Sequence, residues 1–258
     1  FEAKIHELGP DTVLAFAMEP VGGLATGCAV PPPAYFEGIR DICSRHGIFL
    51  IFDEVLCGTG RTGQFLNAHY YPDALPDIVV MAKGLGSGYA PLGATLFPAH
   101  LVDQLSTLTG FGFSHTYNAN PITCATGLAV LDEYERLNLI DNAAAMGDYL
   151  KERVWALTDE FPIIGDVRGQ GLLLGIELVA DPISKQPMAA EFLPTEKIRI
   201  HGLNNGLIIY SRQTAGGKYG DWFLLSPPLT ITQAECDELL RRLRATFIDF
   251  VSDWKGCQ

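Results

Sequence analysis

The 258-residue sequence has few basic residues, no long apolar run and no paired cysteine motif. Its 18 lysines and arginines face 30 acids, which gives a formal net charge of −12, and the basic residues form no stripe. Such a surface repels phosphate backbones and anionic lipids, so we expect neither nucleic acid nor a membrane as a partner. No apolar run reaches the roughly 18–20 residues that span a bilayer.

The six cysteines are scattered along the sequence. None forms a C-x-x-C pair and their spacings match no zinc module, so the sequence predicts no metal site. Reduced thiols are typical of cytoplasmic proteins, and the first residues, FEAKIHELGPDTV, resemble no secretion signal. We therefore expect a cytoplasmic location. The cysteines are at positions 28, 43, 57, 124, 236 and 257.

The first half of the chain alternates apolar runs with helical patterns. Runs at 13–20, 48–55 and 77–84 predict buried strands, and apolar residues at helical spacing predict a helix over 34–47. Near-continuous apolar strands separated by helices are typical of a parallel sheet covered on both faces. A long helical pattern then extends from Ile122 to about residue 157.

The second half has a different pattern of predicted strands and helices, so we place a domain boundary near residue 140. The chain begins almost directly on a predicted core strand, and we therefore expect it to lack an N-terminal part. Strands are predicted at 163–169, 171–180, 206–211 and 221–226, and helices at 195–206 and 233–254.

Two neighbouring features of the sequence, a glycine pattern and an apolar strand that ends in an acid, suggest nucleotide binding as an alternative. Gly58, Gly60 and Gly63 fit G-x-G-x-x-G after a strand, but the following residues are a poor helix and Arg61 interrupts the loop. The strand that ends at Asp53 also resembles the magnesium-binding strand of a P-loop nucleotidase. The required G-x-x-x-x-G-K-[ST] loop does not occur in the sequence, although a missing N-terminal part could have carried it.

Asp53 and Lys83 favour a different chemistry. Each follows a buried strand of the predicted parallel sheet, and functional groups gather at the carboxyl edge of such sheets. A desolvated lysine provides the neutral amine that Schiff-base chemistry needs. A carboxylate against a pyridinium nitrogen keeps pyridoxal 5'-phosphate (PLP) protonated as an electron sink. We therefore expect both side chains to be buried and to meet one PLP molecule.

The sequence resembles the class III, or omega-type, PLP-dependent aminotransferases. The resemblance implies an α/β fold, PLP-transferase fold type I, with a mainly parallel sheet flanked by helices and a smaller α+β C-terminal domain. Residues 1–140 would form the C-terminal part of the large PLP-binding domain, and 141–258 the small domain. The matching segments are AMEPVGG (17–23), IFDEVLCGTGRTG (51–63), DIVVMAKGLGSGYAPLGA (77–94), FSHTYNANPITCATGLAVL (113–131), VRGQGLLLGIEL (167–178) and LLSPPLTIT (224–232).

The resemblance also implies a role for each site residue. Lys83 would form the Schiff base with PLP and then carry a proton, Asp53 would pair with the ring nitrogen, and Val55 would pack under the ring. Thr116 would donate its hydroxyl to the cofactor phosphate of a partner subunit, which implies an obligate homodimer. Arg212 would grip a substrate carboxylate, with a plain surface arginine as the alternative.

The implied reaction is transamination between a primary amine or omega-amino acid and a keto acid such as pyruvate. Leu56 and the Leu224–Leu225–Ser226 stretch depart from the residues expected for ornithine-type and aminobutyrate-type enzymes. Aminomutase or decarboxylase chemistry on the same scaffold, a nucleotide-binding module with Asp53 on magnesium, and a non-catalytic remnant are the alternatives. The sequence leaves open whether this chain is active alone.

Overall fold

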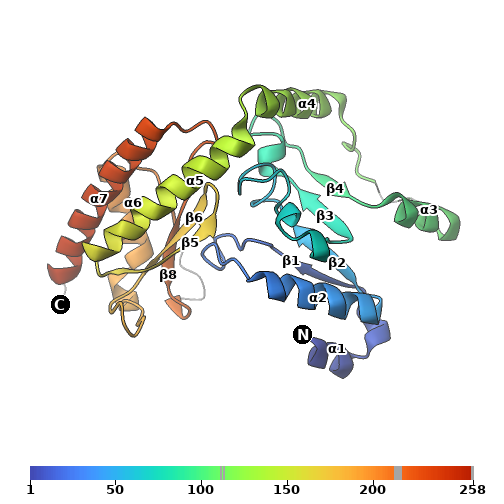
Figure 1. The fold of residues 1–258 in the computed structure, drawn as a ribbon, viewed down its shortest axis with the longest axis horizontal. Coiled ribbons are helices and arrows are strands. Elements are labelled where there is room, and N and C mark those ends of the chain that lie inside the picture. The colour runs from blue at the N-terminus through green and yellow to red at the C-terminus, as the bar shows by residue number, and fades with distance from the viewer. Residues whose placement is uncertain (111, 113, 212–216, 257–258) are drawn as a thin grey trace. The chain divides into compact units, whose positions relative to one another are not determined.

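The computed structural model describes residues 1–110, 112, 114–211 and 217–256, which form two compact units (Figure 1). The two units are not consecutive halves of the sequence, because two short segments of the first half belong to the second unit. The first unit contains Phe1–Pro20, Pro31–Gly60 and Gln64–Leu139, and the second contains Val21–Val30, Arg61–Gly63 and Ile140–Gln258.

The first unit is built on a four-stranded sheet with the order β1-β2-β3-β4. The first three strands are parallel, and β4 pairs with β3 in the antiparallel direction. The predicted parallel sheet is therefore confirmed, whereas the short edge strand β4 was not predicted. The strands are β1 (Ala15–Met18), β2 (Phe49–Asp53), β3 (Ile78–Met81) and β4 (Ala94–Leu96).

Helix α2 (Pro33–His46) packs along this sheet, as Figure 1 shows in blue. Its buried residues Phe36, Ile39 and Cys43 recur at helical spacing and pack against Leu50 and Phe52 of β2. The helix ends at Gly47, whose left-handed φ of 65° suits a residue without a side chain. The other helices of this unit are α1 (Glu2–Leu8), α3 (Ala99–Leu108) and α4 (Pro121–Arg136), with 3-10 turns at Pro10–Thr12, Asn67–Tyr70, Pro72–Ala74 and Lys83–Leu85.

The single long helix predicted over 122–157 is two helices, α4 and α5 (Leu139–Ala156). Asn138, between them, has a left-handed φ of 49°, which an α-helix cannot contain. The amino end of α4 is capped by Asn120, whose side-chain oxygen accepts from Ile122 N at 3.0 Å and Thr123 N at 3.3 Å. The helical periodicity was correct, but it did not reveal the break.

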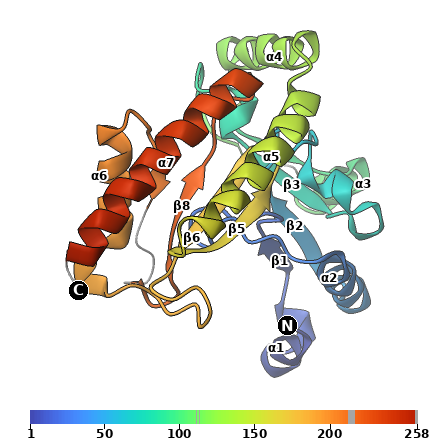
Figure 2. The ribbon, with the colours of Figure 1, turned by 60° about the vertical axis from the view of Figure 1, so that its left-hand side comes forward.

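The second unit contains an antiparallel sheet with the order β5-β6-β8-β7. Helices α5 and α7 lie side by side in Figure 2, and Tyr149 of α5 donates to Asp237 of α7 at 2.6 Å. Phe223 of β8 is fully buried against Phe247 of α7. The strands and remaining helices are β5 (Ile164–Gln170), β6 (Leu173–Leu178), β7 (Tyr210–Ser211), β8 (Asp221–Leu225), α6 (Pro194–Asn204) and α7 (Gln233–Gly256), with 3-10 turns at Leu157–Asp159 and Ala190–Phe192.

Two inserted segments complete this second unit. The indole N–H of Trp222 donates to the Leu24 carbonyl at 2.6 Å, and Arg168 Nε donates to the Gly27 carbonyl at 2.7 Å. Arg61 and Leu172 are joined by backbone hydrogen bonding, with Leu172 N donating to Arg61 O at 3.0 Å. These contacts hold the two segments in the second unit together with the residues that follow Leu139.

Gly171 marks a close approach inside the second unit. Its φ is 53°, and a Cβ there would lie 2.5 Å from the carbonyl carbon of Thr62. A Cβ on Gly147 of α5 would in turn lie 2.3 Å from Gly171. Glycine is therefore required where α5, the β5–β6 turn and the 61–63 segment meet.

Across the part of the chain that the structure describes, no helix is both long and apolar enough to cross a bilayer.

Candidate active site

Asp53 and Lys83 lie at the same edge of the first sheet. Asp53 is the last residue of β2 and pairs in register with Val80 of the parallel strand β3. Lys83 comes three residues after Val80, so its backbone lies at most about 10 Å farther along the strand direction, at ~3.3 Å per residue. The two side chains therefore start from neighbouring strand ends at the carboxyl edge, where parallel sheets hold their ligands.

Asp53 is half-buried and fixed by its own turn. Its Oδ1 accepts a hydrogen bond from the Val55 backbone N–H at 3.0 Å. Because Phe52 is buried in the core beside α2, the alternation of a strand places Asp53 on the opposite face. Val55 is half-buried just beyond the strand end. The carboxylate is thus held in place at the edge of the sheet, where it is only partly buried.

Glu54, between these two residues, is a positioned carboxylate that sequence reasoning missed. It is fully buried, and its two oxygens accept from Asn67 N at 2.5 Å and Ala68 N at 2.9 Å. Burial raises the pKa of Glu54, and the two backbone hydrogen bonds oppose that rise. The acidic pair Asp53–Glu54 was the available signal, but it did not show which acid faces the core.

Lys83 begins a tight turn. Its φ is 44°, and Leu85 N donates to the Ala82 carbonyl at 3.0 Å. The next residue, Gly84, is close to the loop after β2, since a Cβ there would lie 3.2 Å from Thr59 Cβ. Tyr134 of α4 also reaches Gly84, its hydroxyl donating to the carbonyl at 3.5 Å. The two loops that follow β2 and β3 therefore pack against each other.

The expected burial of Lys83 is not found within this chain, where its side chain is exposed. The expectation came from the apolar run that precedes it, but β3 ends at Met81 and the chain turns before the lysine. Asp53 is likewise half-buried rather than buried. The sequence thus predicted the strand that precedes Lys83, but it did not predict that the side chain of Lys83 is exposed.

The remaining predicted site residues are less constrained. Thr116 is exposed in a turn that precedes α4. Arg212 lies outside the described residues.

The glycine fingerprint does not have the context that dinucleotide binding requires. Gly63 is followed by bends and a short 3-10 helix at Asn67–Tyr70, not by an α-helix that could receive a pyrophosphate. Arg61 has a structural use instead, because its Nη1 donates to the carbonyls of Leu172 at 3.2 Å and Pro227 at 2.5 Å. Among the described residues, Asp53 belongs to no group of three metal-ligating side chains.

The donor set at this edge fits PLP. A carboxylate ends one parallel strand, and a lysine follows the neighbouring strand at the same edge of the sheet. These are the two side chains that PLP requires, one as the covalent partner and one beside the ring nitrogen.

Comparisons with known proteins agree with this chemistry. Residues 1–247 match the family described as aminotransferase class-III. A taurine–pyruvate aminotransferase of Bilophila wadsworthia is 37% identical over 95% of this chain and 54% of its own length. The chain spans about half the length of the curated relatives it matches.

Solved structures extend the similarity to the fold. An (S)-enantioselective omega-transaminase from Thermomicrobium roseum matches 97% of this chain and 54% of its own, with 37% identity and a TM-score of 0.88. An amine transaminase from an uncultivated Pseudomonas species, solved in its PLP-bound form, matches 96% and 55%, with 38% identity and a TM-score of 0.87. The predicted PLP-transferase architecture is therefore confirmed.

Proposed function

Because this chain belongs to the class III aminotransferases, we propose that it is the catalytic-lysine portion of a PLP-dependent transaminase. The reaction would move an amino group from a primary amine or omega-amino acid to a keto acid such as pyruvate. The observation that carries the proposal is the placement of Asp53 and Lys83 at the ends of two adjacent parallel strands. The first unit would then be the C-terminal part of the large domain, and the second unit the small domain.

Pyridoxal phosphate, when bound, supplies an electron-accepting ring that stabilises negative charge at the substrate carbon. Lys83 would hold it covalently through Nζ. After release, the same amine would take a proton from the substrate carbon and deliver it to the neighbouring cofactor carbon. A lysine suits this work because its flexible stem lets one nitrogen reach both positions from a fixed backbone turn.

Asp53 would hold the proton on the ring nitrogen. Its Oδ1 already accepts the Val55 N–H, so the turn orients the carboxylate before any ligand arrives. Glu54, the next residue, would help to fix this turn, because its buried carboxylate accepts hydrogen bonds from two backbone N–H groups. Val55, beside the carboxylate, would pack against the ring face.

The proposed substrate class is supported by the names of two relatives and by the sequence position of Arg212. One relative is named for taurine and pyruvate, and one structural neighbour is an omega-transaminase. The first name gives taurine and the keto acid pyruvate as the two substrates, and the second names the omega class of transaminase. A guanidinium at Arg212 would bind the carboxylate of the keto acid in a bidentate manner.

We also propose a homodimer in the cytoplasm. Large apolar side chains are exposed around Thr116 and on α4, with Tyr117 82%, Ile122 76% and Leu128 65% exposed. A second copy covering this surface would remove them from water and bring Thr116 to the phosphate of its partner's cofactor. The cytoplasmic location is supported by the sequence, because scattered cysteines without a C-x-x-C pair are typical of proteins with reduced thiols.

Covalent labelling tests the assignment of Lys83 directly. The 258-residue chain is incubated with PLP, reduced with borohydride and digested, and the modified peptide is identified by mass spectrometry. We expect label on Lys83, and Lys83→Ala should remove it while Lys255→Ala, at an exposed position on α7, leaves it unchanged. Label spread evenly over surface lysines, with Lys83 no more reactive than Lys255, contradicts the proposal.

Asp53 is tested by its effect on reactivity. Asp53→Asn should preserve labelling of Lys83 but slow the amine-dependent loss of the visible cofactor band by at least about a hundredfold, since a preorganised charge at the reaction centre is removed. A near-normal rate would mean that another group anchors the ring nitrogen.

A further inference from the structure

Three metal-ligating side chains meet where α1 lies against the end of α2. Glu2 and His6 are four residues apart, so they lie on the same face of α1. His46 is the last residue of α2. One ligand atom from each of the three lies within 4.8 Å of the other two.

Both helices that carry these side chains are anchored. Ile5, between Glu2 and His6, is 1% exposed and belongs to the core cluster that also contains Phe36 of α2. Helix α2 ends directly after His46, where Gly47 N closes the last turn on Ser44 O. The side chains therefore start from fixed backbone positions, which lowers the entropy that a ligand must remove when it binds.

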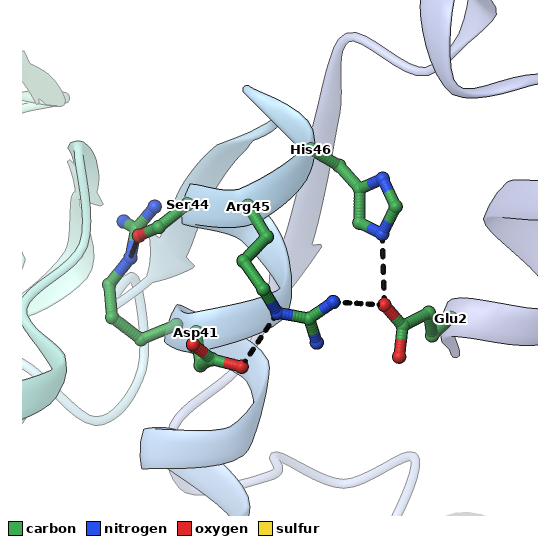
Figure 3. A network of polar contacts seen from close by, with 6 residues as sticks. Glu2, Asp41, Ser44, Arg45 and His46 are labelled. Atoms are coloured by element: carbon green, nitrogen blue, oxygen red, sulfur yellow. Dashed lines mark hydrogen bonds and ion pairs between the residues drawn. The ribbon is translucent and has the colours of Figure 1, made fainter.

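The carboxylate of Glu2 is the centre of a polar network in Figure 3. Its Oε1 accepts from the guanidinium of Arg45 and lies 2.9 Å from His46 Nε2. The hydrogen bonds from Arg45 and His46 fix the position of the Glu2 carboxylate. Arg45 also donates to Asp41 at 2.9 Å, and that second acid balances its charge.

We propose that Glu2, His6 and His46 form a binding site for a divalent transition metal ion of the zinc class. Two imidazoles and one carboxylate are a ligand set that Zn²⁺ takes in proteins. Ligand atoms of a tetrahedral zinc site lie about 3.4 Å apart, given bonds of ~2.0–2.2 Å, so small side-chain rotations close the present arrangement. His6 is exposed, which leaves the fourth position to water.

The ion would replace the hydrogen bond between His46 and Glu2 and would cross-link α1 to α2. The two imidazole rings already lie next to each other in a T-shaped arrangement, with centroids 5.2 Å apart and planes at 81°. The site uses neither Asp53 nor Lys83. The proposal is therefore independent of the transaminase assignment.

Metal titration of the 258-residue chain tests the site. Zn²⁺ and Ni²⁺ are titrated by calorimetry into a Cys124→Ser background, because Cys124 is an exposed thiol among the described residues that could also bind metal. We expect one ion per chain, with affinity at least about tenfold weaker in His6→Ala and in His46→Ala, and also reduced in Glu2→Gln. His100→Ala is the matched control, since this exposed histidine of α3 lies outside the cluster.

A second measurement distinguishes metal binding at Glu2, His6 and His46 from nonspecific attraction of cations to an acidic surface. Zn²⁺ should slow amide hydrogen exchange in residues 1–8 of the wild-type chain and have no such effect in His6→Ala. Equal affinities in His6→Ala and the parent, or exchange in residues 1–8 that does not respond to metal, would overturn the proposal. His6 is the decisive position, because its side chain is exposed and its removal is expected to leave the fold intact.

Discussion

Replacing Asp221 by asparagine should make the second unit more stable at neutral and alkaline pH. Asp221 is the first residue of β8 and is 2% exposed. Its Oδ1 has no hydrogen-bond partner among the described residues. Burial in this poorly solvated position raises the pKa of Asp221 to about 6, because the charged form loses its water without gaining a counter-ion.

The size of the effect follows from that pKa. A rise from 3.8 to about 6 corresponds to roughly 3 kcal/mol, at about 1.4 kcal/mol for each pH unit. Below pH 3.8 the carboxyl is protonated in both the folded and the unfolded chain, and ionisation costs nothing. Between 3.8 and about 6 only the unfolded chain ionises, so the cost grows, and above about 6 it is complete.

The asparagine variant carries no charge at any of these pH values. Its advantage over the wild type should therefore fall from about 3 kcal/mol at pH 8 to about 1 kcal/mol at pH 4.5. Urea unfolding followed by tryptophan fluorescence measures this difference in the correct unit, because Trp155, Trp222 and Trp254 all belong to the second unit. Asp148→Asn, on the exposed side of α5, is the control for loss of one negative charge.

Two outcomes would refute the reasoning about Asp221. One is a stability difference that does not change between pH 4.5 and 8, which would mean that the carboxyl is not titrating in the folded state. The other is a variant that is less stable than the wild type at pH 8, which would mean that the charge has a partner that stabilises it.

Two further substitutions test buried features of each unit. Glu54→Gln should lower the free energy of unfolding of the first unit by about 2 kcal/mol, because one of the two backbone N–H groups would face the amide NH₂ instead of a carboxylate oxygen. Urea unfolding followed by far-UV circular dichroism measures this loss, and an unchanged free energy of unfolding would contradict it. Gly171→Ala should destabilise the second unit by about 3 kcal/mol, because the new Cβ would be 2.5 Å from Thr62 at a left-handed φ. Gly38→Ala, on α2 with no atom within 4 Å of a new Cβ, is expected to be neutral or stabilising by up to about 1 kcal/mol.

The parallel sheet could be predicted from the sequence because its strands are short, apolar and separated by clear helical patterns. The apolar runs at 48–55 and 77–84 contain β2 and β3, and the acid and the lysine that follow them lie at one edge. The placement of Asp53 and Lys83 needed only the rule that parallel strands end on the same side.

Other features depend on tertiary contacts that no local pattern carries. Strand β4 has only three residues, Ala94–Leu96, which are too few to show a periodicity in the sequence. Its pairing with β3 could therefore not be predicted. The break before α5 rests on the left-handed φ of a single asparagine. Glu54 and Asp53 are chemically similar neighbours, and only the packing of Asn67 and Ala68 decides which acid is buried.

The threading of Val21–Val30 and Arg61–Gly63 into the second unit limits how this protein can be divided. A chain that starts at Ile140 would leave the indole of Trp222 and the guanidinium of Arg168 without the carbonyls of Leu24 and Gly27. Proteolysis near residue 140 would accordingly yield two pieces that stay associated, because Val21–Val30 and Arg61–Gly63 pack in the second unit but would belong to the N-terminal piece. An exchange of the second unit for that of another protein therefore has to include these two segments.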